Sequence, residues 1–274
     1  GYTMPAIDGS FLDFKQLDLL AMRQTPVHRL DPRAKVLTTI GFILCVVSFG
    51  RYEISAMLPF LIYPAVLMAV GDLPGGYILR KILIVIPFAL IIGIFNPVFD
   101  RQVIMQLGPL DIWGGWVSCA SILIRAILTA SVAIILVAVT GFPAICEALE
   151  KMGMPKVFAV QLLFLYRYIF VLTDEGVRTA RARQLRTFGK RGFGIRQFGS
   201  MVGHLLLRTW DRAERIHMAM LARGFCGEFR TTRSQSRFGS EEIVFMGGWM
   251  TLFMLLRVYN APQLLGSLFT GTAP

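Results

Sequence analysis

Five apolar runs of membrane-spanning length most constrain what this chain of 274 residues can fold into. A helix needs roughly 17 to 25 apolar residues to cross a bilayer, and it satisfies its own backbone polar groups there. The mean hydropathy of +0.60 and a charged fraction of 16% fit this class, because soluble domains carry about 25% charged residues. We therefore expect an all-α polytopic membrane protein with about five transmembrane helices. The runs are Ala34 to Gly50, Ile54 to Gly71, Ile82 to Phe99, Trp116 to Phe142, and Ile243 to about Tyr259.

Arg125 is the only charged residue deep within one of these runs. An intramembrane arginine costs a few kcal/mol on insertion scales, which makes it a functional candidate. It could equally snorkel to the interface or pair within the helix bundle, and the sequence leaves both alternatives open. Pro59, Pro64 and Pro87 also fall inside the runs, where we expect them to kink the helices.

Basic residues gather on the flanks that would share one side of the membrane. They precede the first run, open the third at Arg80 and Lys81, and follow the fourth, where 17 Lys and Arg face five Asp and Glu between Lys151 and Arg237. That stretch carries +12 and the rest of the chain −1, so the charge faces a partner or an anionic surface. The positive-inside rule then gives a cytoplasmic amino end and an external carboxyl end. We expect a multi-pass protein of the bacterial cytoplasmic (inner) membrane.

Four segments follow from this orientation: a cytoplasmic amino-terminal segment (1–33), four transmembrane helices (34–142), a cytoplasmic region (143–241), and a last transmembrane helix with a tail (242–274). Within the cytoplasmic region, a first helix should begin at Pro143 and stop at Gly153. A second, opening at Met154-Pro155-Lys156, keeps helical spacing until Phe188-Gly189. After a glycine-rich link, a third runs from about Phe198 to Arg223. In that helix Arg208 has Asp211 within reach at i,i+3.

Both long cytoplasmic helices end in Ala-Arg, followed within a few residues by Phe and Gly. Alanine leaves the backbone uncovered, so a partner can approach closely, and a projecting guanidinium can fork onto a carboxylate in a groove. The alternative is a purely structural role, because cations and glycine favour the carboxyl ends of helices. The candidate docking residues are Ala182, Arg183, Arg186, Ala222, Arg223 and Gly224.

These motifs resemble those of the transmembrane T component of energy-coupling factor (ECF) transporters, and more closely its cobalt-type (CbiQ-like) branch. The resemblance includes the stretch His28 to Lys35 before the first span and Leu165-Tyr166-Arg167-Tyr168 in the second cytoplasmic helix. Asp31 and Pro32 also suit an N-cap and a first helical residue, and Arg33 and Lys35 would anchor the helix start at the headgroups.

The resemblance implies that residues 143–241 form a coupling-helix domain that sits on two copies of a cytoplasmic ATPase subunit. In that family the arginine of each motif reaches an acidic residue in one ATPase groove, which corresponds to Arg183 and Arg223 here. The first motif departs from the family pattern at Gln184 and Thr187, so either Arg183 or Arg186 is its main contact. A separate membrane subunit would bind the substrate; the cobalt-type resemblance favours cobalt, with nickel or a vitamin as alternatives.

The residues themselves give no sign of a catalytic site, a cofactor site or a metal site in this chain. The only Gly-Lys pair, Gly189-Lys190, lacks the rest of a phosphate-binding loop, so ATP would be bound by the partner subunits. The three histidines and four cysteines show no metal-ligand spacing. A nucleic-acid partner is disfavoured because few aromatic residues interleave with the arginines. A polytopic enzyme acting on lipids lacks paired acid or base groups, whereas anionic lipids would attract the basic stretch.

Overall fold

The computed structural model describes residues 20–23, 25–50, 53–95, 103–107, 110–186, 195–226 and 239–258. Side chains are not described for 103–107, 110–113, 183, 184, 186 and 195–198. The chain divides into two compact units. Within the described residues, the bundle unit comprises residues 17–145 and 235–274, and the arm unit comprises residues 146–234. The predicted segment borders at 143 and 241 lie near these divisions and stay predictions.

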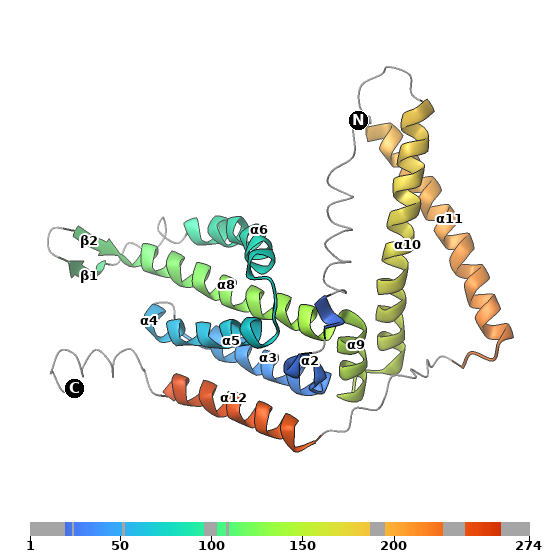
Figure 1. Cartoon of the computed structure of the whole chain (residues 1–274). Helices are drawn as coiled ribbons and strands as arrows, with labels where there is room; N and C mark the ends of the chain where they lie inside the picture. Colours follow the sequence, from blue (N-terminus) through green and yellow to red (C-terminus); the bar gives the residue numbers. More distant parts are fainter. Residues whose placement is uncertain are drawn as a thin grey trace. The chain divides into compact units, whose positions relative to one another are not determined.

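The bundle unit consists of a series of helices and one short β-hairpin (Figure 1). α8 packs against α6 and α3, and α3 packs against α12 on its other side. α3 therefore lies between two long helices. The elements are α2 (Pro26–Arg29), α3 (Pro32–Val47), α4 (Ile54–Met57), η1 (Leu58–Leu61), α5 (Ile62–Val70), α6 (Gly75–Ile94), β1 (Val103–Leu107), β2 (Leu110–Trp113), α8 (Gly114–Thr140) and α12 (Ser240–Val258).

The predicted class, an all-α membrane protein, is confirmed, with one short addition. β1 and β2 form an antiparallel hairpin between α6 and α8, pairing Leu107 with Leu110 and Gln106 with Asp111. The sequence analysis did not predict this hairpin. It occupies only a few residues between two long helices, so it leaves the helical class unchanged.

Three helices of the described chain are long and apolar enough to cross a membrane, compared with about five predicted. They are α6, α8 and the Lys156–Ala182 part of α10 (Lys156–Arg186). α3 has only 16 residues, and the second predicted run is split by the 3-10 turn η1, which has Pro59 in its first turn. α12 has 19 residues but carries Glu241, Glu242 and Arg257. The apolar stretch of α10 was assigned to the cytoplasmic side from sequence, and that assignment stays a prediction.

A cluster of aromatic rings forms the centre of the bundle between α3, η1, α5 and α12. The Phe42 ring centroid lies 5.0 Å from Tyr63 and 5.4 Å from Phe253, and Tyr63 meets Trp249 edge-on at 4.7 Å. Gly41 on α3 lets the end of the Met250 side chain lie close to the helix backbone, and a larger residue at this position would require Met250 to move. Edge-on and tilted ring pairs at these distances add to the free energy of apolar burial, and they fix α12 against α3.

Two arginines from neighbouring helices close the carboxyl end of α3. Arg125 on α8 donates Nη2 hydrogen bonds to the carbonyls of Phe49 at 3.0 Å and Gly50 at 3.4 Å. Arg257 on α12 donates to the carbonyl of Ser48 at 3.1 Å and lies 4.4 Å from the Phe49 ring centroid. These carbonyls have no partners within the helix. Of the two roles left open for Arg125, the structure therefore shows pairing within the bundle.

The amino end of α3 begins as predicted. Asp31 is the N-cap, and its Oδ1 accepts from the backbone N–H of Arg33 at 2.8 Å, with Pro32 in the first helical position. Lys35 differs from the prediction: it is only 5% exposed, and its Nζ lies 3.5 Å from the carbonyl of His28. Its ammonium group is directed back into the protein, so Lys35 is not a headgroup anchor.

His28 stabilises the turn before α3 through both ring nitrogens. Nδ1 lies 2.6 Å from Thr25 Oγ1, and Nε2 lies 3.1 Å from the Leu20 carbonyl. A carbonyl only accepts, so Nε2 carries the proton and, in the neutral ring, Nδ1 accepts from the hydroxyl. Burial lowers the pKa of His28 below its usual 6.5, and the charges of Lys35 and Arg23 lower it further, while the bond to Leu20 acts in the opposite direction.

Removing the arginine that closes α3 should destabilise the bundle. We expect Arg125→Met to lower the free energy of unfolding by about 1–3 kcal/mol, because it leaves the carbonyls of Phe49 and Gly50 without a donor. Thermal unfolding of the purified protein in detergent measures this. Arg80→Met, which removes an exposed arginine from α6, is the matched control and should change little. Equal unfolding midpoints for the two variants would contradict the interpretation.

The histidine turn predicts a stability that depends on pH. Because the folded-state pKa of His28 is lowered, the neutral ring stabilises the fold above the unfolded pKa of 6.5, and this contribution is lost as pH falls through the folded pKa. We expect the unfolding midpoint of the wild type to fall more steeply than that of His28→Gln between about pH 7 and pH 5. His204→Gln, at an exposed position on α11 (Ile195–Ala222), should follow the wild-type curve. Parallel curves for the wild type and His28→Gln would refute this role.

Candidate docking surface on the arm unit

The helix that crosses the border between the two units stops where the sequence predicted. α9 (Phe142–Lys151) has Pro143 at its second residue, and Gly153 takes a φ of +112° just beyond its end. The N–H of Met154 bonds to the carbonyl of Leu149 at 3.0 Å, and that of Gly153 to Glu150 at 3.1 Å. This pair of bonds is a Schellman motif, in which glycine accepts the left-handed conformation without strain. The chain then turns through Pro155 into α10.

α10 and α11 form a long antiparallel pair (Figure 1). Arg208 on α11 donates to Glu175 on α10 at 3.1 Å, so these two positions lie at the same level. The helical spacing predicted Asp211 as the partner of Arg208 within its own helix, but Arg208 pairs with Glu175 on the neighbouring helix instead. This pair is largely exposed, so it sets the alignment of the helices more than their stability.

A groove of about 480 Å³ runs between the two helices on one side of this ion pair. Its walls are mainly aromatic and aliphatic, with Arg212, His217 and Gln161 as polar members. The larger apolar side chains are Phe164, Tyr168, Leu172, Leu206, Trp210 and Phe225. Grooves of this size and lining hold ligands or side chains from a partner.

Much of the apolar surface of the arm unit is exposed. Trp210 is 72% exposed. Other exposed large apolar side chains lie along both helices: Val157, Phe158, Leu165, Ile169, Leu185, Val202, Leu206, Leu207, Met218 and Leu221. So many exposed large apolar side chains on two neighbouring helices favour contact with another protein or with a membrane. We therefore expect another molecule to cover these apolar side chains of α10 and α11.

The first Ala-Arg motif lies in the last turns of α10. Ala182 is exposed, and the helix ends at Arg186 within the described residues. The predicted continuation to Phe188-Gly189 lies outside the described residues, as do the side chains of Arg183 and Arg186. The choice between these two arginines as the main contact stays a prediction.

The second motif forms a defined helix end. Arg223 is the C-cap and Gly224 has a φ of +78°. The N–H of Phe225 bonds to the carbonyl of Met220 at 3.1 Å, and that of Gly224 bonds to Leu221 at 3.0 Å, which is again a Schellman motif. The predicted cap at Gly224 is confirmed. Ala222, Arg223 and Gly224 are all exposed, and the space around Gly224 is open.

The antiparallel arrangement places the two motifs at opposite ends of the helix pair. From the level of Glu175 and Arg208, Arg183 lies eight residues further along α10, and Arg223 lies fifteen further along α11 in the opposite direction. At about 1.5 Å per residue, the two positions are on the order of 35 Å apart along the pair. The arm unit thus carries two similar basic ends separated by a groove.

The remaining predicted site residues, Asp31, Pro32, Arg33 and Lys35, belong to the bundle unit. They form the start of α3, whereas the Ala-Arg motifs belong to the arm unit. The groove of the arm unit was missed from sequence. Its signal was available, since Leu206, Ala213 and Met220 recur every seven residues on one face of α11.

Chemistry-bearing side chains are scattered in this part of the structure. No three His, Cys, Asp or Glu residues converge in a metal-binding group among the described residues. Burial raises the pKa of the Cys146 thiol, although a hydrogen bond involving its own backbone lowers it, so the thiol is protonated near neutral pH.

Sequence comparison identifies transport proteins as relatives. The transmembrane protein EcfT of an energy-coupling factor transporter from Heliobacterium modesticaldum is 30% identical over 227 residues, which is 76% of this chain and 83% of the relative. The cobalt transport protein CbiQ of Salmonella typhimurium is 26% identical over 53% of this chain and 69% of its own length. A putative fused cobalt transport protein, CbiMQ of Methanocorpusculum labreanum, is 30% identical over 32% of this chain and 15% of its own.

The family match extends over most of the described structure. The CbiQ family, described as a cobalt transport protein, matches residues 23–235. This range begins before α2 and includes α3 to α8 as well as the helices of the arm unit. The chain therefore belongs to the CbiQ family of cobalt transport proteins.

Proposed function

We propose that this chain is the energy-coupling transmembrane subunit of an ATP-driven ECF-type importer of a metal ion, most favourably cobalt. In this role it has no catalytic residues and no cofactor of its own. ATP is bound and hydrolysed by partner subunits, and the arm unit passes their movement to a membrane subunit that binds the substrate. Cobalt is preferred to nickel or a vitamin because the matching family is described as a cobalt transport protein.

The observation that carries the proposal is the placement of two similar basic helix ends at opposite ends of one antiparallel pair. ATPases of transporters act as pairs, and two equivalent grooves need two equivalent contacts. Arg223 is exposed at a helix end where Gly224 leaves open space, so a partner backbone can approach. A guanidinium held there can form a two-pronged bond with a carboxylate. We therefore expect two ATPase copies per chain, one at each motif.

The exposed apolar surface of α10 and α11 supports a membrane partner. The Lys156–Ala182 part of α10 is apolar enough to lie within a bilayer, and the groove between the helices has aromatic walls. We propose that the substrate-binding subunit covers this surface. The relative CbiMQ of Methanocorpusculum labreanum, named as a putative fused cobalt transport protein, agrees with such a pairing.

The proposed location is the bacterial cytoplasmic membrane, with the amino end and the Ala-Arg motifs on the cytoplasmic side. The bias of Lys and Arg toward the stretch from Lys151 to Arg237 supports this orientation. Anionic lipids would add to the attraction of this stretch to the membrane surface. A nucleic-acid role has no such support.

Charge reversal at the two motifs tests the proposal. In the co-expressed complex, we expect Arg183→Glu and Arg223→Glu each to weaken ATPase binding by about 30-fold or more, because each would oppose a carboxylate that needs a cation. The double variant should lose the ATPase subunits and radioactive cobalt uptake. Co-purification, ATPase activity and uptake are measured on the same preparations, with membrane insertion of the chain checked by detergent extraction.

Arg178→Glu and Arg215→Glu are the matched controls. They make the same charge change at exposed positions on α10 and α11, away from the tip of each motif, and they should keep the complex and its uptake. If the motif variants behave like these controls, the docking role is wrong and the basic stretch is a lipid-facing surface. If the complex assembles and hydrolyses ATP but moves nickel or a vitamin instead of cobalt, only the substrate assignment fails.

A further inference from the structure

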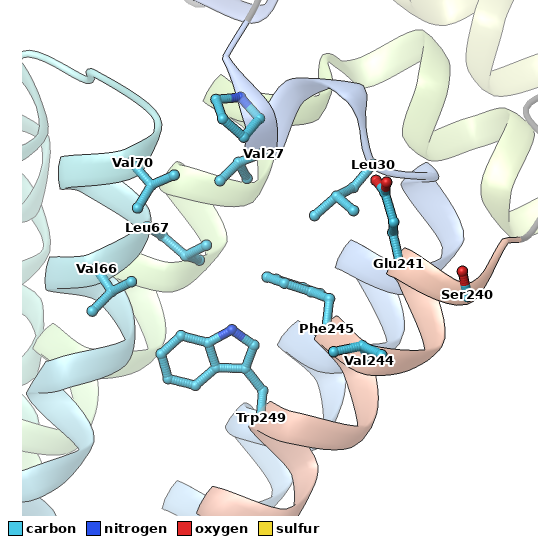
Figure 2. Close-up of a pocket in the computed structure, with 11 residues that line it drawn as sticks. Val27, Leu30, Val66, Leu67, Val70, Ser240, Glu241, Val244, Phe245 and Trp249 are labelled. Carbon is cyan, nitrogen blue, oxygen red and sulfur yellow. The ribbon is translucent and has the colours of Figure 1, made fainter.

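A second cavity lies within the bundle unit, in a place that the proposed function does not use. It has a volume of about 570 Å³ and is bounded by α2, α5 and α12 (Figure 2). Its lining is almost entirely aliphatic and aromatic, with Val27, Leu30, Leu67, Phe245 and Trp249 among the larger side chains. The size falls within the range of about 300–1,000 Å³ that is typical of ligand pockets.

The cavity has one polar end and one apolar end. Ser240 and Glu241, in the first turn of α12, stand at the polar end beside Leu30 (Figure 2). Trp249 forms the apolar end, where its ring is fixed edge-on against Tyr63 at 4.7 Å. A ligand that fits both ends must itself be amphiphilic.

The length of the cavity corresponds to one leaflet of a bilayer. Glu241 and Trp249 are eight residues apart on α12, a rise of about 12 Å, and half the hydrocarbon thickness of a bilayer is about 15 Å. The polar end lies where α3 and α12 begin, and Trp249 lies at the middle of α12, which spans Ser240–Val258. The outer rim of the cavity is apolar and accessible from outside, because Val66, Val70 and Val244 are 37%, 41% and 74% exposed.

The charge at the polar end favours one class of headgroup. Glu242 caps the start of its own helix: its Oε2 accepts a hydrogen bond from the backbone N–H of Gly239 at 2.8 Å, and the residue is 8% exposed. Glu241 is exposed and lines the cavity. A carboxylate at this position attracts an ammonium group and repels an anionic headgroup.

We propose that this cavity binds one acyl chain of an amine-headed zwitterionic membrane lipid, such as phosphatidylethanolamine. The chain lies along α12 between Val66 and Val244 and ends against Trp249. The ammonium group of the headgroup lies beside the Glu241 carboxylate. The site holds α12 and α5 together through the lipid, in the leaflet at the amino ends of α3 and α12.

The fluorescence of Trp249 provides the test. A full-length variant in which Trp249 is the only tryptophan is placed in vesicles containing a lipid with a brominated acyl chain, which quenches tryptophan at short range. We expect brominated phosphatidylethanolamine to quench at an about five-fold lower mole fraction than brominated phosphatidylglycerol, which corresponds to one charge interaction at the headgroup level. Glu241→Gln should remove this preference, and Glu241→Asp should keep it.

A cavity-filling variant separates the site from general lipid contact. Val66→Phe should reduce the quenching by both lipids, whereas Ile62→Phe, at an exposed position on the same helix that does not line the cavity, should leave it unchanged. Native mass spectrometry of the wild type and of Glu241→Gln gives a second measurement that needs no tryptophan changes. Equal quenching by both lipids, or a Val66→Phe variant that behaves like Ile62→Phe, would overturn the proposal.

Discussion

The hydrogen bonds that close the carboxyl end of α3 are the constraint on which the bundle depends. α3 is short, lies between α8 and α12, and ends in carbonyls of Ser48, Phe49 and Gly50 that no helix bond satisfies. Within the hydrocarbon core of a bilayer, such carbonyls have no water with which to form hydrogen bonds. Arg125 and Arg257 supply the donors from the two flanking helices. The same bonds that satisfy the backbone therefore also hold three helices at one level.

The bundle and arm units differ in how far they bury their own apolar side chains. In the bundle, rings from several helices meet in a cluster around Phe42, Tyr63 and Phe253, so the apolar residues find partners inside the unit. In the arm unit, α10 and α11 meet along one groove and one ion pair, and large side chains such as Trp210 stay exposed. A helix pair with so little internal packing gains its order from what binds it. This contrast fits a division between a fixed membrane part and a part that changes partners or positions.

Sequence patterns predicted the helices and their stops well, because these depend on neighbouring residues. The N-cap at Asp31 and the glycine stops at Gly153 and Gly224 are local chemistry. Interactions between residues far apart in the sequence were harder to predict. Arg125 binds carbonyls about 75 positions away, and Arg208 forms its ion pair with a residue on another helix. Lys35 stands at a position in the sequence that is typical of a headgroup anchor, but it is buried and its Nζ lies 3.5 Å from the carbonyl of His28 on α2. A hydropathy run also does not show the turns and charges that shorten a helix, which is why three of the described helices meet the length and composition needed to cross a membrane and the others are shorter or carry charges.

The antiparallel alignment of α10 and α11 has a mechanical consequence. Under the proposed function, oppositely directed forces from two ATPase subunits at the two ends of a helix pair joined near Glu175 and Arg208 would rotate one helix relative to the other instead of shifting both together. The groove between the helices lies on one side of this joint, and its width changes with the angle of crossing. A displacement of a few ångströms at the two basic ends would thus be converted into opening or closing of an apolar surface, with the ion pair acting as the pivot of the lever.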